Sequence, residues 1–235
     1  MGKPFEIRRD IPLPAEPEQV WEAVATGDGL AAWFMPMEID RDSPMVTSWE
    51  PGRRLTVRTP PEDDGAFHTF DYRLEPSRPG TTLLRFLHHG FTSDAWGDHF
   101  EAATGAGWDM YLHTLEQYLT HFPGRPAVYL EAEAPPASAE ADAWPELVAA
   151  LGLTEPGELG AAVHFDLPGV GAVEGVVDYA SASFVGLRAP LALIRFHGRA
   201  PLGMPVAVSQ HTYLTTFDTD SAQRGWEAWL AGVFS

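Results

Sequence analysis

The sequence predicts an α+β protein of two tandem lobes, each an antiparallel sheet followed by a long C-terminal helix. Three observations predict this class. Short strand-like segments follow one another between Pro and Gly turns over residues 37–87, which favours an antiparallel meander. From Trp108 the apolar period becomes helical, with Trp108, Leu112 and Leu115 on one face. After a stop rich in Pro and Gly at residues 122–126, the same order of elements runs again.

The first lobe is predicted to open with a strand at residues 5–13, where apolar and charged residues alternate. Pro17 can occupy the first turn of a helix, and apolar residues recur at helical spacing on either side of residues 27–29, which predicts two short helices. Strands are then expected at residues 37–39, 45–49, 54–59, 69–74 and 81–87.

We place the boundary between the lobes in the stop, which gives domains of residues 1–124 and 125–235. The second lobe is expected to contain a strand at 128–134, a short helix at 141–151 and strands at 161–167, 173–179, 184–188, 191–197 and 206–216. Its final helix carries Trp226 and Leu230. The dipeptide Gly107-Trp108 of the first long helix has a counterpart in Gly225-Trp226.

Composition excludes several classes of function. A net charge of −18 repels phosphate backbones and anionic head groups, so no nucleic-acid partner is expected. No apolar run approaches the roughly 20 residues that span a bilayer, so no membrane insertion is expected. The chain has no cysteine, which excludes disulfides and thiolate metal sites. Charged residues stand where a signal peptide needs an apolar run, and we expect a cytoplasmic protein.

Several ordered patterns of the first lobe carry a family resemblance. They are residues 17–21 (Pro-Glu-Gln-Val-Trp), 30–34 (Leu-Ala-Ala-Trp-Phe), 49–55 (Trp-Glu-Pro-Gly-Arg-Arg-Leu), 88–91 (His-His-Gly-Phe) and 107–108 (Gly-Trp). With them, residues 5–122 resemble the START-like (SRPBCC) helix-grip superfamily, in the branch of the activator of heat-shock protein ATPase homologues. The resemblance implies a curved antiparallel sheet wrapped around a long C-terminal helix, with a cavity between them. The second lobe lacks two of these patterns, so only the architecture is carried over to it, as a divergent copy.

A group of aromatic residues and one histidine is expected to converge between the sheet and the long helix of the first lobe, because strand residues alternate faces and the helix has one apolar face. Two interpretations stay open, a packed core or a cavity that binds a small ligand through aromatic side chains and a few polar groups. The predicted ligand-binding residues are Trp33, Phe34, Trp49, Phe70, Tyr72, Phe86, His88, Phe91, Trp108 and Tyr111.

His88 is predicted to point inward, in phase with Phe86. An inward imidazole can hydrogen bond to a ligand oxygen, act as an acid or base, or serve as a buried structural histidine. The residues Asp94, Asp98 and His99 match no closed zinc pattern, so no metal site is expected. The chain has no nucleophile elbow, phosphate loop or dinucleotide fingerprint, and no cofactor is expected.

Three hypotheses for function follow. The first is a module that binds a small hydrophobic or aromatic molecule, which stacks on Trp33, Trp49 or Trp108 and is oriented by His88 or Tyr72. The second is a cyclase- or hydratase-like enzyme, with His88 as general base and Tyr72 or Tyr111 polarising a carbonyl group. The third, which the family resemblance implies, is a protein-interaction or chaperone-cofactor module. The two lobes are expected to form a pseudo-dimer within one monomeric chain.

Overall fold

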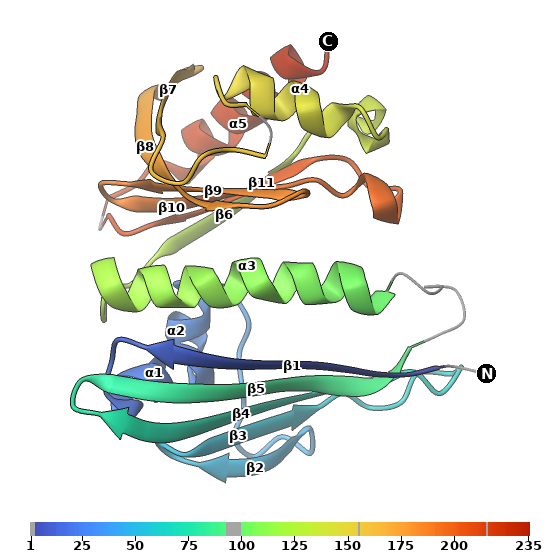
Figure 1. Cartoon of the computed structure of the whole chain (residues 1–235), viewed down its shortest axis with the longest axis vertical. Coiled ribbons are helices and arrows are strands. Elements are labelled where there is room, and N and C mark those ends of the chain that lie inside the picture. Colours follow the sequence, from blue (N-terminus) through green and yellow to red (C-terminus); the bar gives the residue numbers. More distant parts are fainter. Residues whose placement is uncertain (1–2, 93–99, 155, 215) are drawn as a thin grey trace. The chain divides into compact units, whose positions relative to one another are not determined.

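The computed structural model describes residues 3–92, 100–154, 156–214 and 216–235, and its contacts divide the chain into two units, Met1–Arg125 and Pro126–Ser235 (Figure 1). The predicted α+β class, with two tandem helix-grip lobes, is confirmed. The first unit contains β1 (Lys3–Leu13), α1 (Pro17–Ala25), α2 (Gly27–Ala31), β2 (Val46–Glu50), β3 (Arg54–Arg58), β4 (Phe67–Arg78), β5 (Thr81–Thr92) and α3 (Phe100–His121).

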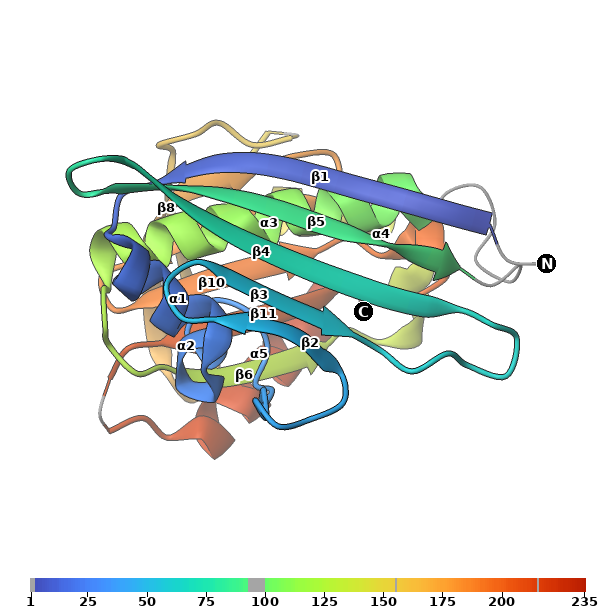
Figure 2. The ribbon, with the colours of Figure 1, turned by 90° about the horizontal axis from the view of Figure 1, so that it is seen from below.

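The sheet of the first unit has the strand order β1-β5-β4-β3-β2, with every neighbouring pair antiparallel. Figure 2 shows its strands side by side with α3 running across one face. The register places His88 of β5 between Ile7 of β1 and Phe70 of β4. Because strand side chains alternate faces, His88, Phe70 and Ile7 all point toward α3.

The two short helices are fixed by side chains at their ends. Pro17 stands in the first turn of α1, and the amide of Glu16 donates to the side chain of Gln19 at 3.2 Å. The Glu16 carboxylate in turn accepts from the amide of Gly80, in the β4–β5 turn, at 2.8 Å. The indole of Trp33 donates to the carbonyl of Ala23 in α1 at 2.8 Å. These bonds hold α1 and α2 against the end of the sheet.

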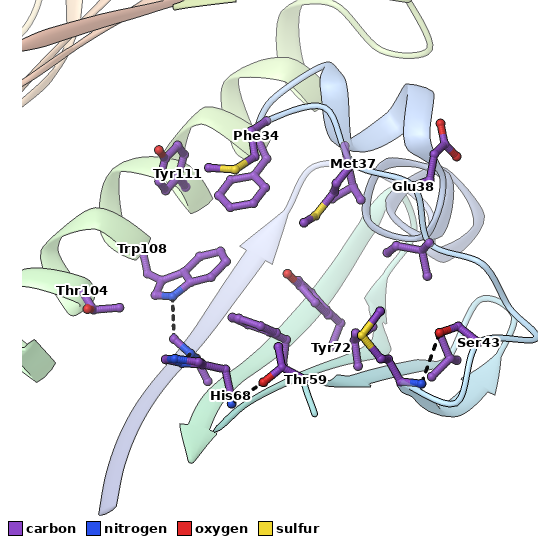
Figure 3. Close-up of a pocket in the computed structure, with 18 of the residues that line it drawn as sticks. Phe34, Met37, Glu38, Ser43, Thr59, His68, Tyr72, Thr104, Trp108 and Tyr111 are labelled. Atoms are coloured by element: carbon purple, nitrogen blue, oxygen red, sulfur yellow. Dashed lines mark hydrogen bonds between the residues drawn. The ribbon is translucent and has the colours of Figure 1, made fainter. Parts of the chain in front are cut away.

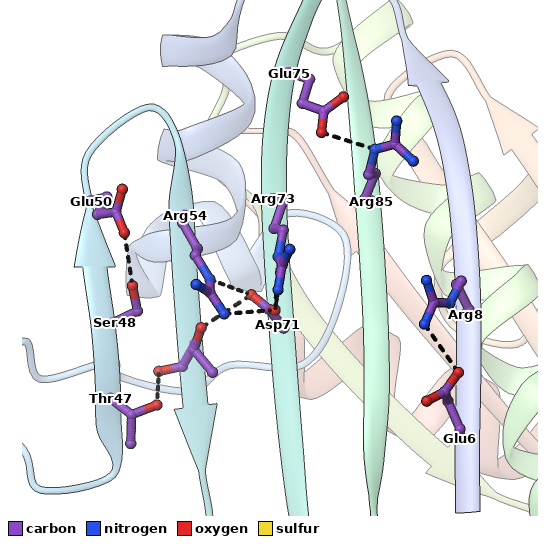
Figure 4. A network of polar contacts seen from close by, with 11 residues as sticks. Glu6, Arg8, Thr47, Ser48, Glu50, Arg54, Asp71, Arg73, Glu75 and Arg85 are labelled. Carbon is purple, nitrogen blue, oxygen red and sulfur yellow. Dashed lines mark hydrogen bonds and ion pairs between the residues drawn. The ribbon is translucent and has the colours of Figure 1, made fainter.

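The face of the sheet that is turned away from α3 carries an ion-pair network around Asp71 (Figure 4). Arg54 of β3 donates to both carboxylate oxygens of Asp71 at 3.0 and 3.1 Å, and Arg73 and the hydroxyl of Thr56 donate at 3.0 and 3.1 Å. Burial raises the pKa of Asp71, but the hydrogen bonds from Arg54, Arg73 and Thr56 outweigh it and hold the pKa below its ordinary value. The network joins β3 to β4 on this face. The opposite face of the same two strands is turned toward α3.

The second unit repeats the strand arrangement of the first. Its sheet has the order β6-β11-β10-β9-β8-β7, so that the first strand again pairs with the last strand before the final helix. Besides two short 3₁₀ turns, Pro136–Ala139 and Ala200–Leu202, it contains β6 (Val128–Glu133), α4 (Ala143–Ala150), β7 (Ala162–Leu167), β8 (Gly171–Ala180), β9 (Phe184–Ala189), β10 (Ala192–His197), β11 (Ala207–Thr212) and α5 (Thr219–Val233).

The core of the second unit is packed with large side chains. Trp226 of α5 and Phe196 of β10 are fully buried and contact each other edge to face, with ring centroids 5.7 Å apart. The indole of Trp226 donates to the side-chain oxygen of Gln210 at 2.7 Å. Leu147 of α4 and Leu187 of β9 belong to the same core.

Several elements differ from the sequence prediction, and three of the differences concern the surroundings of the site described below. The expected strand at residues 37–39 is absent from the described part of the chain, because the segment between α2 and β2 is a loop, in which Met37 is exposed and Ile39 is half-buried. Strand β4 begins at Phe67, two residues earlier than expected. Helix α3 already includes Phe100, well before the Trp108 at which its apolar period is clear.

Candidate functional site

The first unit contains a cavity of about 630 Å³ between the concave face of the sheet and α3. Strands β2, β3, β4 and β5 supply its floor, α3 supplies one wall, and the loop from Phe34 to Met45 supplies its mouth. A volume of this size is in the range of small-molecule sites. The residues that line it are Leu30, Phe34, Met35, Met37, Glu38, Ile39, Asp40, Ser43, Met45, Val46, Val57, Thr59, His68, Phe70, Tyr72, His88, Phe100, Thr104, Gly107, Trp108 and Tyr111.

Aromatic rings form the inner wall of the cavity. Trp108 and Tyr111 lie one turn apart on α3, so both face the sheet. Phe34 stacks on Trp108 with ring centroids 5.4 Å apart and contacts Tyr111 edge to face at 4.7 Å. On the floor, Phe70 stacks on His88 at 4.3 Å. These contacts leave flat apolar faces next to the open volume (Figure 3).

The mouth of the cavity combines exposed methionines with acidic residues. Met35, Met37 and Met45 are 38%, 45% and 42% exposed, which is high for large apolar side chains. Methionine is unbranched and polarisable, so such a rim can adapt to ligands of different shape. Glu38 and Asp40 stand on the same loop. Among the described residues that line the cavity, none is a lysine or arginine.

A chain of hydrogen bonds crosses the floor from α3 to β4. The indole nitrogen of Trp108 donates to Nδ1 of His88 at 2.9 Å, and Nε2 of His88 lies 3.0 Å from Nδ1 of His68. An indole N–H can only donate, so Nδ1 of His88 is an acceptor and its proton resides on Nε2. That proton is donated to Nδ1 of His68, which places the proton of His68 on its own Nε2. The two bonds therefore fix both histidines as neutral Nε2–H tautomers.

The electrostatics agree with two neutral imidazoles. Burial lowers the pKa of His88 to about 3, helped by the neighbouring charges of His68 and His89 when they are protonated. Burial also lowers the pKa of His68, against a smaller opposing effect of Glu62. The pKa of the Tyr72 hydroxyl is raised by burial, so this group stays protonated at neutral pH. The cavity thus offers hydrogen-bond donors without a positive charge.

Comparison with known proteins identifies the unit that contains the cavity. The family model described as "Activator of Hsp90 ATPase homolog 1-like protein" matches residues 14–120. The first unit belongs to this family. No curated protein sequence matches the chain.

Solved structures similar to the chain include the Aha1 dimer from Colwellia psychrerythraea, which is 21% identical over 48% of this chain and 95% of its own, with a TM-score of 0.40. CalU16 from Micromonospora echinospora is 20% identical over 51% of this chain and 87% of its own, with a TM-score of 0.39. DynU16, described as a putative protein in the dynemicin biosynthetic locus, is 17% identical over 97% of this chain and 95% of its own, with a TM-score of 0.39.

Most of the predicted ligand-binding residues of the first unit line the cavity. They are Phe34, Phe70, Tyr72, His88, Trp108 and Tyr111. Tyr72 points into the space between Trp108, Phe34 and Met37 (Figure 3). These residues come from α3, from β4 and β5, and from the beginning of the segment that follows α2.

The other predicted ligand-binding residues lie elsewhere in the first unit and do not line the cavity. Trp33 follows α2, is fully buried and donates its indole proton to Ala23 of α1, and Phe86 packs against Trp108 with ring centroids 4.3 Å apart. Trp49 contacts Trp21 of α1 edge to face at 5.1 Å, outside the cavity. The placement of Phe91 was wrong, because alternation from His88 puts residue 91 on the outer face, where it is 42% exposed.

His88 points inward as predicted, but the geometry does not suit a general base. A base needs a free lone pair directed at its substrate. The lone pair on Nδ1 of His88 accepts from Trp108, and the other ring nitrogen faces His68. A pKa of about 3 also makes His88 a weak base at neutral pH.

Sequence reasoning missed His68 and the methionines of the mouth. His68 precedes the strand predicted at residues 69–74, yet it is in phase with Phe70 and Tyr72, and extending the alternation backwards would have found it. Met35, Met37 and Met45 carry no periodic signal because they stand on a loop.

The sequence predicted neither a metal site nor a membrane-spanning segment. Asp94, Asp98 and His99 lie outside the described residues. In the part of the chain that the structure describes, no group of three or more acidic or histidine side chains is placed to hold a metal ion. Within the same ranges, no helix has both the length and the apolar character needed to cross a bilayer.

The second unit keeps one element of the site and loses the rest. Gln210 of β11 accepts the indole proton of Trp226 as His88 accepts that of Trp108, and its amide nitrogen donates to the hydroxyl of Thr212 at 2.7 Å. A hollow of about 320 Å³ lies beside Gln210 and Thr212, roughly half the volume of the cavity in the first unit. The Trp–acceptor bond is thus present in both units, but the acceptor is a glutamine amide in the second unit and a histidine ring in the first.

Proposed function

We propose that the first lobe, residues 1–124, binds a small hydrophobic or aromatic molecule in its cavity, and that residues 125–235 form a second lobe with a largely filled core. The observation that carries the proposal is the cavity itself. A volume of about 630 Å³ stays open between the sheet and α3, although the surrounding side chains pack tightly. Its wall is aromatic and its few polar groups converge on the floor, which is the usual construction of a small-ligand site.

The aromatic wall explains the proposed preference for planar ligands. Phe34 and Trp108 are stacked with an interplanar angle of 15°, so a planar ligand beside them can lie nearly parallel to both rings. A planar ring that packs on this surface gains apolar burial and a favourable ring contact, the latter worth about 0.5–1.5 kcal/mol. The flexible methionines can close over the ligand edge without a specific shape of their own.

The test uses a residue that can block the cavity without disturbing the fold. Gly107 lines the cavity, and a Cβ atom added there would meet no atom within 4 Å. Gly107→Phe should fill the volume and, because glycine weakens helices, should not destabilise α3. The matched control is Gly232→Phe on α5, where an added Cβ likewise meets no atom within 4 Å.

The measurement is a thermal-shift screen of the whole chain against fatty acids, sterols, aromatic polyketides and flavonoids. A ligand that binds the folded state raises the melting temperature in a concentration-dependent way. We expect a shift in the wild type and in Gly232→Phe, and none in Gly107→Phe. A shift that survives Gly107→Phe would place binding elsewhere, and the absence of any shift would contradict the proposal.

The other sequence-based hypotheses stay predictions. No observed contact favours catalysis or docking on a protein partner over ligand binding. A cytoplasmic location and a pseudo-dimer within a monomeric chain are likewise retained as part of the proposal.

A further inference from the structure

The hydrogen-bond chain on the cavity floor ends in a donor for which the described part of the chain supplies no acceptor. Trp108 donates to His88, which donates to Nδ1 of His68, so the proton on Nε2 of His68 is the terminus of the chain. Among the described residues, no group accepts a hydrogen bond from this nitrogen. The ring of His68 lines the cavity, between Phe5 at 5.4 Å and Phe100 at 6.0 Å.

A second donor lies on the same strand. Tyr72 is only 6% exposed, and its hydroxyl points into the cavity with no partner among the described residues (Figure 3). Buried polar groups are normally hydrogen bonded, and a buried donor without a partner costs free energy. Two donors from one strand therefore face a volume in which the matching acceptor must come from the ligand or from solvent.

The charges around the cavity limit what that acceptor can be. No lysine or arginine is present among the described lining residues, both histidines are held neutral, and Glu38 and Asp40 stand at the mouth. A carboxylate or phosphate that entered would lose its hydration without gaining a cation, which is costly in an apolar site. An uncharged oxygen such as that of a ketone, quinone or ester needs only the donors that are present.

We propose that the ligand of the first lobe is an uncharged, largely apolar molecule with a carbonyl-type oxygen, and that His68 is the residue that hydrogen bonds to this oxygen. His88 and Trp108 are positioning residues, because they act by fixing the tautomer and orientation of His68. The inference rests on the proposed function and names the class of ligand for the same cavity. It assigns no covalent chemistry to the site.

The test compares three probes that share the fluorene ring system. 9-Fluorenone has a carbonyl oxygen at C9, fluorene lacks it, and fluorene-9-carboxylate carries a charged carboxylate on the same carbon. Equilibrium dialysis against the whole chain should give the tightest binding for fluorenone, with fluorene about 3- to 10-fold weaker, the range expected for one hydrogen bond. The carboxylate should bind most weakly of the three.

Variants of the protein test whether His68 is the donor to the carbonyl oxygen of fluorenone. His68→Phe keeps a ring against Phe5 and Phe100 but removes the donor, so it should weaken fluorenone to the level of fluorene and leave fluorene unchanged. His68→Gln restores an N–H donor and should recover part of the difference. His89→Phe is the matched control, since His89 is the next residue after His88 on β5 and does not line the cavity. It should bind all three probes like the wild type.

Each outcome separates the two proposals. If none of the probes binds but the thermal-shift screen finds ligands that Gly107→Phe blocks, the proposed function stands and this inference fails; if neither experiment finds binding, both fail. If fluorene and fluorenone bind equally, the cavity binds apolar ligands but the inference is overturned. A loss of selectivity in Tyr72→Phe, with selectivity retained in His68→Phe, would overturn the assignment to His68.

The tautomers provide a readout that needs no ligand. Long-range nitrogen–proton NMR correlations should show both His68 and His88 as neutral Nε2–H tautomers in the free protein. Trp108→Phe removes the donor that fixes them and should produce mixed tautomers together with reduced fluorenone selectivity. A proton on Nδ1 of His88 in the wild type would refute the chain of hydrogen bonds.

Discussion

Replacement of His88 by glutamine is expected to remove an acid sensitivity from the first unit while it keeps both hydrogen bonds of the floor. In the second unit, Gln210 already accepts the indole proton of Trp226 at 2.7 Å. In His88→Gln the amide oxygen can accept from Trp108 and the amide nitrogen can donate to His68 in the same way. At pH 8 the variant should match the stability of the wild type within about 1 kcal/mol.

The difference should appear as the pH falls. The pKa of His88 is lowered to about 3 by burial, whereas an unfolded histidine has a pKa of about 6.5. Because the folded-state pKa is the lower one, the unfolded state takes up the proton first, so the wild type is most stable above pH 6.5 and loses stability below it. One pH unit is worth about 1.4 kcal/mol, so at pH 5 the loss from His88 alone is about 2 kcal/mol. His88→Gln should be more stable than the wild type by about this amount.

Hydrogen exchange measured by mass spectrometry isolates the effect in one unit. Peptides from β4 and β5 report the opening of the first unit, and peptides from β9 and β10 provide an internal control that should not differ between the two proteins. His68 is present in both proteins, so its own titration largely cancels. If the wild type and the variant lose protection in parallel between pH 8 and pH 5, the neutral, hydrogen-bonded state of His88 is refuted.

Three further changes test other parts of the first unit. Trp108→Ala should lower the free energy of unfolding by about 3–5 kcal/mol in urea titrations, because it empties a buried site and leaves Nδ1 of His88 without its donor; a loss below about 1 kcal/mol would contradict the packing. Gly90→Ala should cost about 1–3 kcal/mol or more, since its Cβ would lie 2.0 Å from the carbonyl oxygen of Phe67 and force β4 away from β5; an unchanged urea midpoint would show that no such approach exists. Asp71→Asn should cost about 1–2 kcal/mol at pH 7, discounted for the exposure of its arginine partners. Because the folded-state pKa of Asp71 is lowered, its contribution is fully present above a pH of about 4 and is lost as the pH falls from there through the lowered pKa, so the difference between the two proteins should shrink below pH 4; a constant difference would contradict this.

The fold could be predicted because its signals are periodic. Alternation along β5 placed Phe86 and His88 inward, and the helical period from Trp108 identified the long helix that covers the sheet. The same alternation excludes Phe91 from the cavity. It was included among the ligand-binding residues because it is aromatic, although its position along the strand puts it on the outer face. The principal error in the fold concerned residues 37–39, where apolar residues beside Pro36 were interpreted as a strand.

The site was harder to predict because its chemistry depends on contacts between strands. Nothing in the sequence pairs His68 with His88, which are 20 residues apart; the register of β4 on β5 brings them within 3.0 Å. The order Trp108–His88–His68 follows from three elements meeting at one point. Trp33 and Trp49 have the right residue type, but the position of α1 turns them toward helix packing instead of the cavity.

The methionines at the mouth would make the proposed ligand binding sensitive to oxidants. Met35, Met37 and Met45 are accessible to peroxide, whereas Met110 in α3 is fully buried and protected. Oxidation turns a flexible thioether into a polar sulfoxide, and cells carry reductases that reverse this change. A low concentration of peroxide should therefore lower the affinity for an apolar ligand before it damages the fold. Treatment with the reductase should restore the affinity. The rim that accommodates the ligand would then also report the redox state of its surroundings.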